Sequence, residues 1–211
     1  MASRDPRPLL IFPCNGNGLE ALDCLGEDYR CIGFVDDTLT KQGTSTYGVP
    51  VFGRGAFEDF PDASVLAVPG SPTSFRARRQ VIAGLNVKDG RFARIIHPSA
   101  KIAPQATIGR NVLIMAGVVL TSNCAIGDHV CILPNTVIHH DSTVGDWSLI
   151  GSNVTIAGGV TIGENCYIGS GCSIMNNLNL GAGAMLGLGS NLISNVAPGA
   201  TLVGNPARAI R

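Results

Sequence analysis

An aliphatic residue recurs at every sixth position over the C-terminal half of the chain. These positions are Ile96, Ile102, Ile108, Ile114, Leu120, Ile126, Ile132, Ile138, Val144, Ile150, Ile156, Ile162, Ile168, Ile174, Leu180, Leu186 and Leu192. Helices repeat about every 3.6 residues and half-buried strands about every two, so this period indicates short strands that turn corners, each with one aliphatic side chain directed inward. The position four residues after each aliphatic is usually small, as in Ala106, Val112, Cys124, Ser142, Val154, Cys166, Cys172 and Ala184. The pattern predicts a triangular prism in which three hexads close one coil of about 18 residues.

The first part of the chain has a different pattern. Apolar strands are predicted at residues 9–12, 31–35 and 65–68, and helical spacing covers residues 19–25 and 74–82. Strands that alternate with helices are typical of a small parallel α/β sheet. We therefore predict two domains: an α/β domain over residues 1–94, and an all-β prism of hexads over residues 95–211 that begins in a hinge at 95–100.

Composition narrows the classes of partner. The chain has 211 residues, 45% of them hydrophobic, which is enough for a packed core. Its 15 basic and 15 acidic residues balance, and this argues against a nucleic-acid partner, which requires a basic surface. Few charges fall in the hexad region, so we expect one flank to be hidden in an oligomer. The start of the chain lacks the apolar core of a signal peptide and no segment has the length of a membrane span, so we expect a cytoplasmic protein.

The seven cysteines fit no disulfide framework, because their number is odd and no CxxC occurs. Cys124, Cys166 and Cys172 occupy the small inward position of the hexad. We interpret them as small apolar fillers of the prism.

The segments 108–112, 126–130 and 162–166, which read IGRNV, IGDHV and IGENC, resemble the hexapeptide repeat of acyltransferases. The resemblance implies a left-handed parallel β-helix, acetyl-CoA or a related thioester as acyl donor, and a homotrimer with active sites between subunits. With the small N-terminal domain and the hinge sequence IHPSA, the whole chain resembles the bacterial sugar acyltransferases grouped with sialic-acid O-acetyltransferase. Relatives there have a Rossmann-like N-terminal domain and N-acetylate nucleotide-linked 4-amino-4,6-dideoxy sugars, such as bacillosamine and perosamine precursors.

Acetyl transfer needs a base that removes a proton from the attacking amine or hydroxyl. The segment Val137–Asp141 matches the family motif of a hydrophobic pair, any residue, His, and then Asp or Glu. The resemblance makes His140 the base, and Asp141 would orient its ring. Of the other histidines, we expect His139 to be secondary, His97 to be structural in the hinge, and His129 to be solvated.

The six-residue period tests this assignment. Three hexads make a coil of about 18 residues, so His140 stacks between Ser122 and Gly158. Gly158 leaves bare backbone beside the imidazole, and its amide N–H could stabilise the oxyanion of a tetrahedral intermediate. In the family a backbone amide at the matching position binds the acetyl carbonyl. No cysteine lies in this stack, so we predict direct transfer without an acyl-enzyme.

Further binding residues follow from the resemblance. Gly187 and Gly189 resemble the glycine-rich coil that lines the CoA tunnel in the family. The closing segment Gly204–Arg208 resembles the family's Gly-x-Pro-Ala-Lys, and Arg208 would keep a positive charge near the CoA nucleotide.

The loop after the first strand is expected to hold the nucleotide-linked substrate. The family has a glycine-rich loop here whose amides cradle a diphosphate, and Asn15, Gly16, Asn17 and Gly18 stand at that place. Pro13 replaces the family's first glycine, and Asn17 replaces its histidine. Asp36 and Asp37 end the second strand, as the family's uracil- or ribose-facing acids do. The base (UDP, GDP or dTDP) and the sugar stay open.

Several alternatives remain open. O-acetylation of a sugar is the second candidate, and acyl groups other than acetyl are a further choice. A zinc-dependent γ-type carbonic anhydrase would need three histidines, two of them about five residues apart, and the sequence offers no such set, so no metal site is predicted. A non-catalytic β-helix binding protein would not require His140 and Asp141 beside Gly158. A serine acetyltransferase would have a helical domain in place of the α/β domain.

Overall fold

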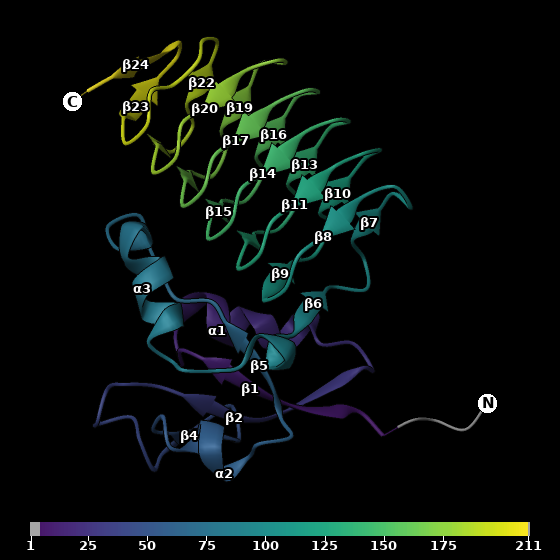
Figure 1. Ribbon diagram of the computed structural model, residues 1–211, viewed down its shortest axis with the longest axis vertical. Helices are drawn as coiled ribbons and strands as arrows, with labels where there is room; N and C mark the ends of the chain where they lie inside the picture. The colour runs from purple at the N-terminus through teal and green to yellow at the C-terminus, as the bar shows by residue number, and fades with distance from the viewer. Residues whose placement is uncertain (1–4, 211) are drawn as a thin grey trace.

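The computed structural model describes residues 5–210, which form an α/β domain against one side of a three-sided parallel β-helix (Figure 1). Residues 1–4 and 211 lie outside the described residues. The expectation that no signal peptide is present, and the outer limits of both predicted domains, fall partly on those residues.

The N-terminal domain is built on a sheet with the strand order β3-β4-β2-β1-β5, in which only the β3–β4 pair is antiparallel. Its strands are β1 (Arg7–Phe12), β2 (Tyr29–Val35), β3 (Ser45–Thr46), β4 (Val49–Phe52) and β5 (Ser64–Ala67). Its helices are α1 (Gly16–Glu20), α2 (Ala56–Asp59) and α3 (Arg78–Ala83), with 3-10 helices η1 (Ala21–Cys24), η2 (Phe75–Ala77) and η3 (Asp89–Arg91). The predicted strands and helices are confirmed, whereas the β3–β4 hairpin and α2 were not predicted. No helix within residues 5–210 has the length and apolar character needed to cross a membrane.

The β-helix has three faces, each a sheet whose strands come from successive coils. Face 1 contains β6 (Arg94–Ile96), β9 (Val112–Ile114), β12 (Cys131–Ile132), β15 (Leu149–Ile150), β18 (Tyr167–Ile168), β21 (Met185–Leu186), β23 (Thr201–Gly204) and β24 (Ala207–Ala209). Face 2 contains β7 (Lys101–Ile102), β10 (Val119–Leu120), β13 (Val137–Ile138), β16 (Thr155–Ile156), β19 (Ser173–Ile174) and β22 (Asn191–Leu192). Face 3 contains β8 (Thr107–Ile108), β11 (Ala125–Ile126), β14 (Thr143–Val144), β17 (Thr161–Ile162) and β20 (Asn179–Leu180).

The strand register confirms the predicted coil. Ile138 pairs with Leu120 on one side and with Ile156 on the other, so each strand lies beside those 18 residues away. The hexad aliphatics fill the interior: those from Ile114 onward are buried, and Ile96, Ile102 and Ile108 at the open end are partly buried. Parallel strands joined by hexapeptide corners fit the expected left-handed β-helix.

Left-handed backbone turns the corners. The third residue after an aliphatic has a positive φ at many corners, and it is usually Asn or Gly, which tolerate this conformation. We name each corner by the two faces that it joins. Corner 2/3 follows face 2 and contains His140; corner 3/1 follows face 3; corner 1/2 follows face 1.

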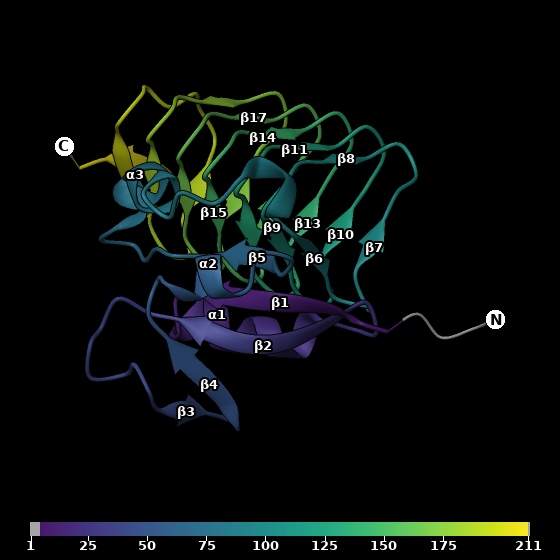
Figure 2. The ribbon, with the colours of Figure 1, turned by 60° about the horizontal axis from the view of Figure 1, so that its bottom comes forward.

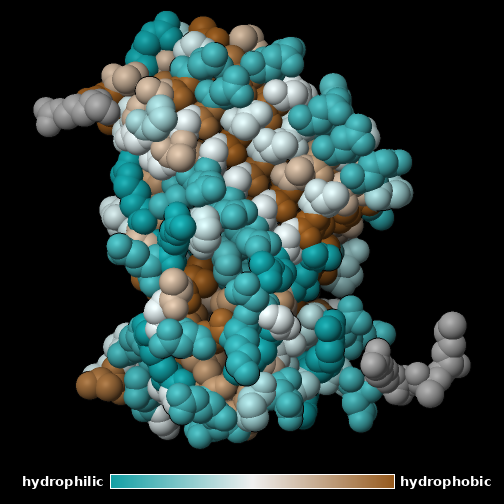
Figure 3. All heavy atoms as spheres, viewed as in Figure 1, coloured by the Kyte–Doolittle hydropathy of each residue, from teal (hydrophilic) through white to brown (hydrophobic). Residues whose placement is uncertain are grey.

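The N-terminal domain packs on face 1, which lies nearest to it in Figure 2. The outward side chains Leu113, Cys131 and Leu149 of this face join one hydrophobic cluster with Ile11 and Leu66 of the α/β sheet. In the space-filling view, hydrophobic residues appear along the coils and at the junction between the domains (Figure 3). Face 1 is therefore the covered side of the prism, and corner 2/3 is the corner opposite the N-terminal domain.

Candidate functional site

His140 stands at corner 2/3, between β13 and β14, and a carboxylate fixes one of its ring nitrogens. Its Nδ1 lies 2.7 Å from Asp141 Oδ2. The other carboxylate oxygen, Oδ1, accepts a hydrogen bond of 3.0 Å from the side-chain amide of Asn123 in the preceding coil. These bonds, first from His140 and then from Asn123, hold the pKa of Asp141 below its usual range. An ionised carboxylate only accepts hydrogen bonds, so Nδ1 carries a proton, and in the neutral imidazole Nε2 presents a free lone pair.

Gly158 lies directly against this imidazole, as the spacing predicts. A Cβ added at Gly158 would lie 2.6 Å from both Cε1 and Nε2 of His140. The ring therefore occupies the space that any side chain at this position would need. Since real Cβ atoms do not approach so closely, any other residue here would force the exposed ring of His140 to move, although the φ of Gly158 is not in the left-handed region.

Some corner amides are capped by a side chain of the coil that follows, whereas the amide of Gly158 is not. At corner 3/1 the Arg110 N–H donates to the carboxylate of Asp128, one coil further on, at 2.7 Å. At corner 1/2 the Ser152 N–H donates to Ser170 Oγ at 3.0 Å. Gly158 has no side chain that could accept a hydrogen bond from an amide of the preceding coil. Within residues 5–210, no group accepts a hydrogen bond from the N–H of Gly158 itself. The Gly158 N–H thus has no acceptor among residues 5–210, and the residue itself lies against the imidazole of His140.

The inner side of corner 2/3 is held by hydroxyl and thiol groups. Ser142 Oγ donates to the carbonyl of Ala157 at 2.9 Å and accepts from the Val160 N–H at 3.2 Å. Cys124 Sγ contacts the carbonyl of His139 at 3.3 Å, and burial raises the pKa of its thiol. All seven cysteines are free, and Cys124, Cys166 and Cys172 are buried in the prism, so the interpretation as core fillers is confirmed.

The structure places the other predicted CoA residues at a different corner. Gly187 and Gly189 follow β21 and precede β22, so they lie at corner 1/2, across face 2 from His140 of the same chain. Arg208 lies in β24, and its guanidinium contacts only the carbonyl of Ala207 among the described residues. One chain therefore does not bring these residues together with His140 and Gly158.

The loop after β1 closes tightly on itself. A Cβ at Gly18 would lie 2.0 Å from the carbonyl oxygen of Pro13, so only glycine fits, whereas a Cβ at Gly16 meets nothing within 4 Å. Asn15 precedes α1 without a side-chain cap, and its neighbour Asn17 lines a cavity of ≈ 100 Å³ between the domains. Gly70, Leu149 and Tyr167 line the same cavity, which joins the loop to face 1.

Both predicted acids at the end of β2 are engaged by the chain itself. Asp36 is only 4% exposed, and its carboxylate accepts from the N–H groups of Cys14 and Thr38 and from Lys41 Nζ. In this structure the oxygens of Asp36 tie two loops together, and its contact with a substrate stays a prediction.

Asp37 is exposed but is also occupied. Both of its oxygens pair with Arg54 at 2.7 Å. Lys41, which the sequence did not single out, is 40% exposed and also donates to the carbonyl of Cys14 at 2.7 Å. It is the cation that borders the loop after β1.

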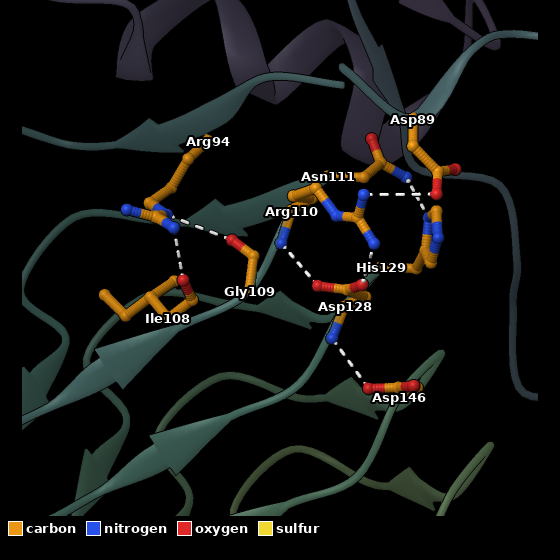
Figure 4. A network of polar contacts seen from close by, with 9 residues as sticks. All are labelled: Asp89, Arg94, Ile108, Gly109, Arg110, Asn111, Asp128, His129 and Asp146. Atoms are coloured by element: carbon orange, nitrogen blue, oxygen red, sulfur yellow. Dashed lines mark hydrogen bonds and ion pairs between the residues drawn. The ribbon is translucent and has the colours of Figure 1, made fainter. Parts of the chain in front are cut away.

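His129 is partly buried, whereas the sequence predicted a solvated side chain. It lies at corner 3/1 in the junction between domains, stacked on Trp147 at 5.7 Å and edge-on to Phe92 at 5.1 Å between ring centroids. Its Nδ1 is 2.9 Å from the side-chain amide of Asn111 (Figure 4). The same amide also pairs with the backbone of β5. His97 stays in the hinge as expected, where its Nδ1 accepts from the Ser99 N–H at 3.0 Å.

Sequence reasoning missed Asn123, although its signal was present. Asn123 precedes Asp141 by one coil of 18 residues, and the same interval had paired His140 with Gly158. Asn occupies the same turn position in many other hexads, so nothing in the hexad of Asn123 distinguishes it.

Comparisons with known proteins agree with this architecture. The family model "Bacterial transferase hexapeptide (six repeats)" matches residues 123–158 and 148–176. The acetyltransferase domain of PglB from Neisseria gonorrhoeae FA1090, solved in complex with acetyl coenzyme A, is 28% identical, with a TM-score of 0.85 over 97% of this chain and 100% of that chain. No protein in a search of curated sequences matches the chain significantly.

Two further solved structures share the fold. PerB from Caulobacter crescentus, in complex with CoA and GDP-perosamine, is 24% identical, with a TM-score of 0.83 and 99% of both chains covered. WeeI from Acinetobacter baumannii AYE is 24% identical, with a TM-score of 0.80 over 97% of this chain and 99% of that chain. At this level of identity the likeness concerns the fold alone, and it extends over both domains.

Proposed function

The chain belongs to the hexapeptide-repeat sugar acyltransferases, and on this premise we propose that it transfers an acetyl group from acetyl-CoA to the amino group of a nucleotide-linked 4-amino-4,6-dideoxy sugar. The observation that carries the proposal is the pairing of His140 and Asp141 beside the free amide of Gly158. A base next to an uncapped N–H is the arrangement that attack of an amine on a thioester carbonyl requires.

Each residue of this group has a separate task. His140 Nε2 takes the proton that the attacking nitrogen loses and returns it to the departing sulfur, so that the thiol of CoA leaves neutral. Asp141 holds the proton on Nδ1 and stabilises the imidazolium between these steps. The Gly158 N–H donates to the carbonyl oxygen as negative charge develops on it.

The residues around Gly158 fit acetyl-CoA, which would supply the acetyl thioester when bound. Any side chain at Gly158 would fill the space beside the imidazole, and the amide there has no other partner within residues 5–210. The 28% identical PglB domain, whose structure contains acetyl coenzyme A, supports the same donor. Gly187, Gly189 and Arg208 remain proposed CoA contacts.

The acceptor class rests on the N-terminal domain. Its parallel strands have the order β4-β2-β1-β5, which supports a Rossmann-like sheet, and ligands of such sheets bind beyond the carboxyl ends of the strands. Asn15, Gly16, Asn17 and Gly18 stand at that edge, next to the cation of Lys41. PerB, which shares the fold, was solved with GDP-perosamine, a nucleotide-linked sugar.

The arrangement of the two domains favours a homotrimer. His140 lies at the corner opposite its own N-terminal domain, and the proposed CoA glycines of the same chain lie across face 2. A threefold assembly would set corner 2/3 of one chain beside corner 1/2 and the N-terminal domain of the next, and so assemble the site from two chains.

Release of CoA thiol in the presence of acetyl-CoA and a panel of UDP-, GDP- and dTDP-linked 4-amino sugars tests the proposal directly. We expect one member of the panel to be acetylated at nitrogen, and His140→Ala to abolish the reaction. Transfer only to sugars that carry a hydroxyl in place of the amine would favour O-acetylation instead. A pre-steady-state burst with an acetylated protein would contradict direct transfer.

A further inference from the structure

We propose that Asn123 is a positioning residue for the base, because it fixes the carboxylate of Asp141 and, through it, the tautomer of His140. This inference rests on the proposed acetyl transfer. The three residues form one chain of hydrogen bonds: Asn123 Nδ2 to Asp141 Oδ1 at 3.0 Å, and His140 Nδ1 to Asp141 Oδ2 at 2.7 Å.

The carboxylate needs this second partner because it is exposed. The Asp141 side chain is 57% exposed and that of His140 is 62% exposed, so water competes for each of their hydrogen bonds. A carboxylate held on a single oxygen can rotate about its side-chain torsion and release the ring. With Asn123 on Oδ1, Oδ2 stays directed at Nδ1, and Nε2 is left unprotonated against Gly158.

The β-helix places Asn123 for this task. Asn123 and Asp141 occupy the same left-handed turn position in successive coils, with φ values of 57° and 60°. The Asp141 N–H donates to the carbonyl of Ser122 at 3.0 Å, which joins the two turns. Gly159 takes the same position one coil further on, with a φ of 70°, so a polar side chain here is not needed to turn the corner. The hydrogen bonds from His140 and Asn123 lower the pKa of Asp141, in agreement with a fixed anion.

Two substitutions distinguish the role of the Asn123 side-chain amide from the role of Asn123 in the left-handed turn. Asn123→Gly removes the donor and keeps a residue that tolerates the left-handed backbone. Asn123→Asp keeps the size of the side chain but replaces the donor with a second carboxylate, which repels Asp141. Asn86→Gly is the matched control, since Asn86 has a φ of 54° and lies in the N-terminal domain. Thermal unfolding of all variants checks that they are folded.

Two measurements test the inference: steady-state kinetics of acetyl transfer, and the ¹⁵N shifts of His140 in labelled protein, which report its tautomer without substrate. We expect Asn123→Gly to lower kcat about tenfold with KM nearly unchanged, Asn123→Asp to lower it further, and both to populate the Nε2-protonated tautomer. The control should match the wild type in both measurements.

An unchanged tautomer in both Asn123 variants would overturn the inference, even if activity fell. An unchanged kcat with a shifted tautomer would overturn it as well, because the orientation of the ring would then not limit catalysis. If the wild-type protein acetylates no amino sugar, the proposed function fails by itself, and the ¹⁵N measurement still decides whether Asn123 sets the tautomer.

Discussion

At the scale of single residues, two adjacent histidines share one corner but differ in their partners. His140 has its Nδ1 bound to Asp141, whereas His139 makes no side-chain hydrogen bond within residues 5–210. His140→Asn keeps a polar side chain of similar shape but cannot accept a proton, so we expect kcat to fall by about 10²- to 10⁴-fold. His139→Ala should change it less than about threefold. Steady-state rates of thiol release measure both, and equal losses in the two variants would contradict the assignment of His140 as the base.

Gly158 offers a test that leaves all polar groups in place. Its φ is not in the left-handed region, so alanine is compatible with the backbone, but the new Cβ would lie 2.6 Å from the imidazole of His140. We expect Gly158→Ala to displace the ring and lower kcat at least about 10²-fold with little loss of stability, because the ring can rotate outward into solvent. The matched control is Gly90→Ala, where a Cβ meets nothing within 4 Å. Full activity of Gly158→Ala would show that the ring need not stay against the Gly158 backbone.

At the scale of structural elements, corner 3/1 joins α3 to the β-helix through one buried cation. Arg78 is 1% exposed, and its guanidinium donates to the carbonyls of Trp147 at 2.9 Å, His129 at 2.6 Å and Pro69. Burial lowers the pKa of this guanidinium to about 10, so it stays charged at neutral pH. Among the described residues, no carboxylate pairs with this guanidinium. Instead, three backbone carbonyls from three separate segments accept its hydrogen bonds.

Replacement of Arg78 should therefore destabilise the junction. Arg78→Met fills much of the volume but leaves the three carbonyls unpaired, and we expect the free energy of unfolding to fall by about 3–5 kcal/mol. Arg79→Met, which removes an exposed cation placed 4.7 Å from the ring centroid of Trp147, should cost about 1 kcal/mol or less. Urea unfolding followed by the fluorescence of Trp147, the single tryptophan, reports on this junction. Similar losses in both variants would mean that the buried hydrogen bonds contribute little.

The same junction predicts a dependence of stability on pH. Burial lowers the pKa of His129 below its ordinary value of about 6.5, against the opposing effect of Asp128. The unfolded chain then binds a proton at His129 more readily than the folded chain does. The contribution of the neutral His129 to the free energy of unfolding is therefore complete above about pH 6.5, and it is lost as the pH falls toward the pKa of His129 in the folded protein. We expect unfolding free energies at pH 7.5 and pH 5.5 to differ less in His129→Asn than in the wild type. An equal difference in both proteins would contradict a partly buried imidazole that resists protonation.

The elements that could be predicted from the sequence are those whose side chains repeat. Each hexad repeats the same pattern of aliphatic and small residues, so the six-residue period predicted the coils, the inward positions and the neighbours of His140. The β3–β4 hairpin has no such repetition, because it turns on Tyr47 and Gly48, both with positive φ, between strands of a few residues. The contacts of His129 and Asp36 were not predicted for a related reason: their surroundings come from the other domain or from a distant loop, and no local spacing encodes those contacts.

At the scale of the whole molecule, the proposed acceptor loop and the proposed base lie on opposite sides of the β-helix. The N-terminal domain covers face 1, and His140 stands at the opposite corner. We therefore expect an acceptor held by the N-terminal loop of one chain to meet the base of another chain. We expect light scattering to give a mass near three times the 21.9 kDa of one chain.

A mixing experiment tests the division of the site more strictly than a mass does. Gly16→Trp places a large side chain in the open space of the loop after β1, where a Cβ meets nothing within 4 Å, and should block the acceptor while the fold is kept. His140→Asn removes the base and leaves the loop intact. Each variant alone should be inactive. If the base and the loop of one site come from different chains, random exchange at equal amounts pairs an intact base with an intact loop in about a quarter of the sites. Mixed and refolded protein should then recover about a quarter of wild-type activity, whereas a site built within one chain would leave the mixture inactive.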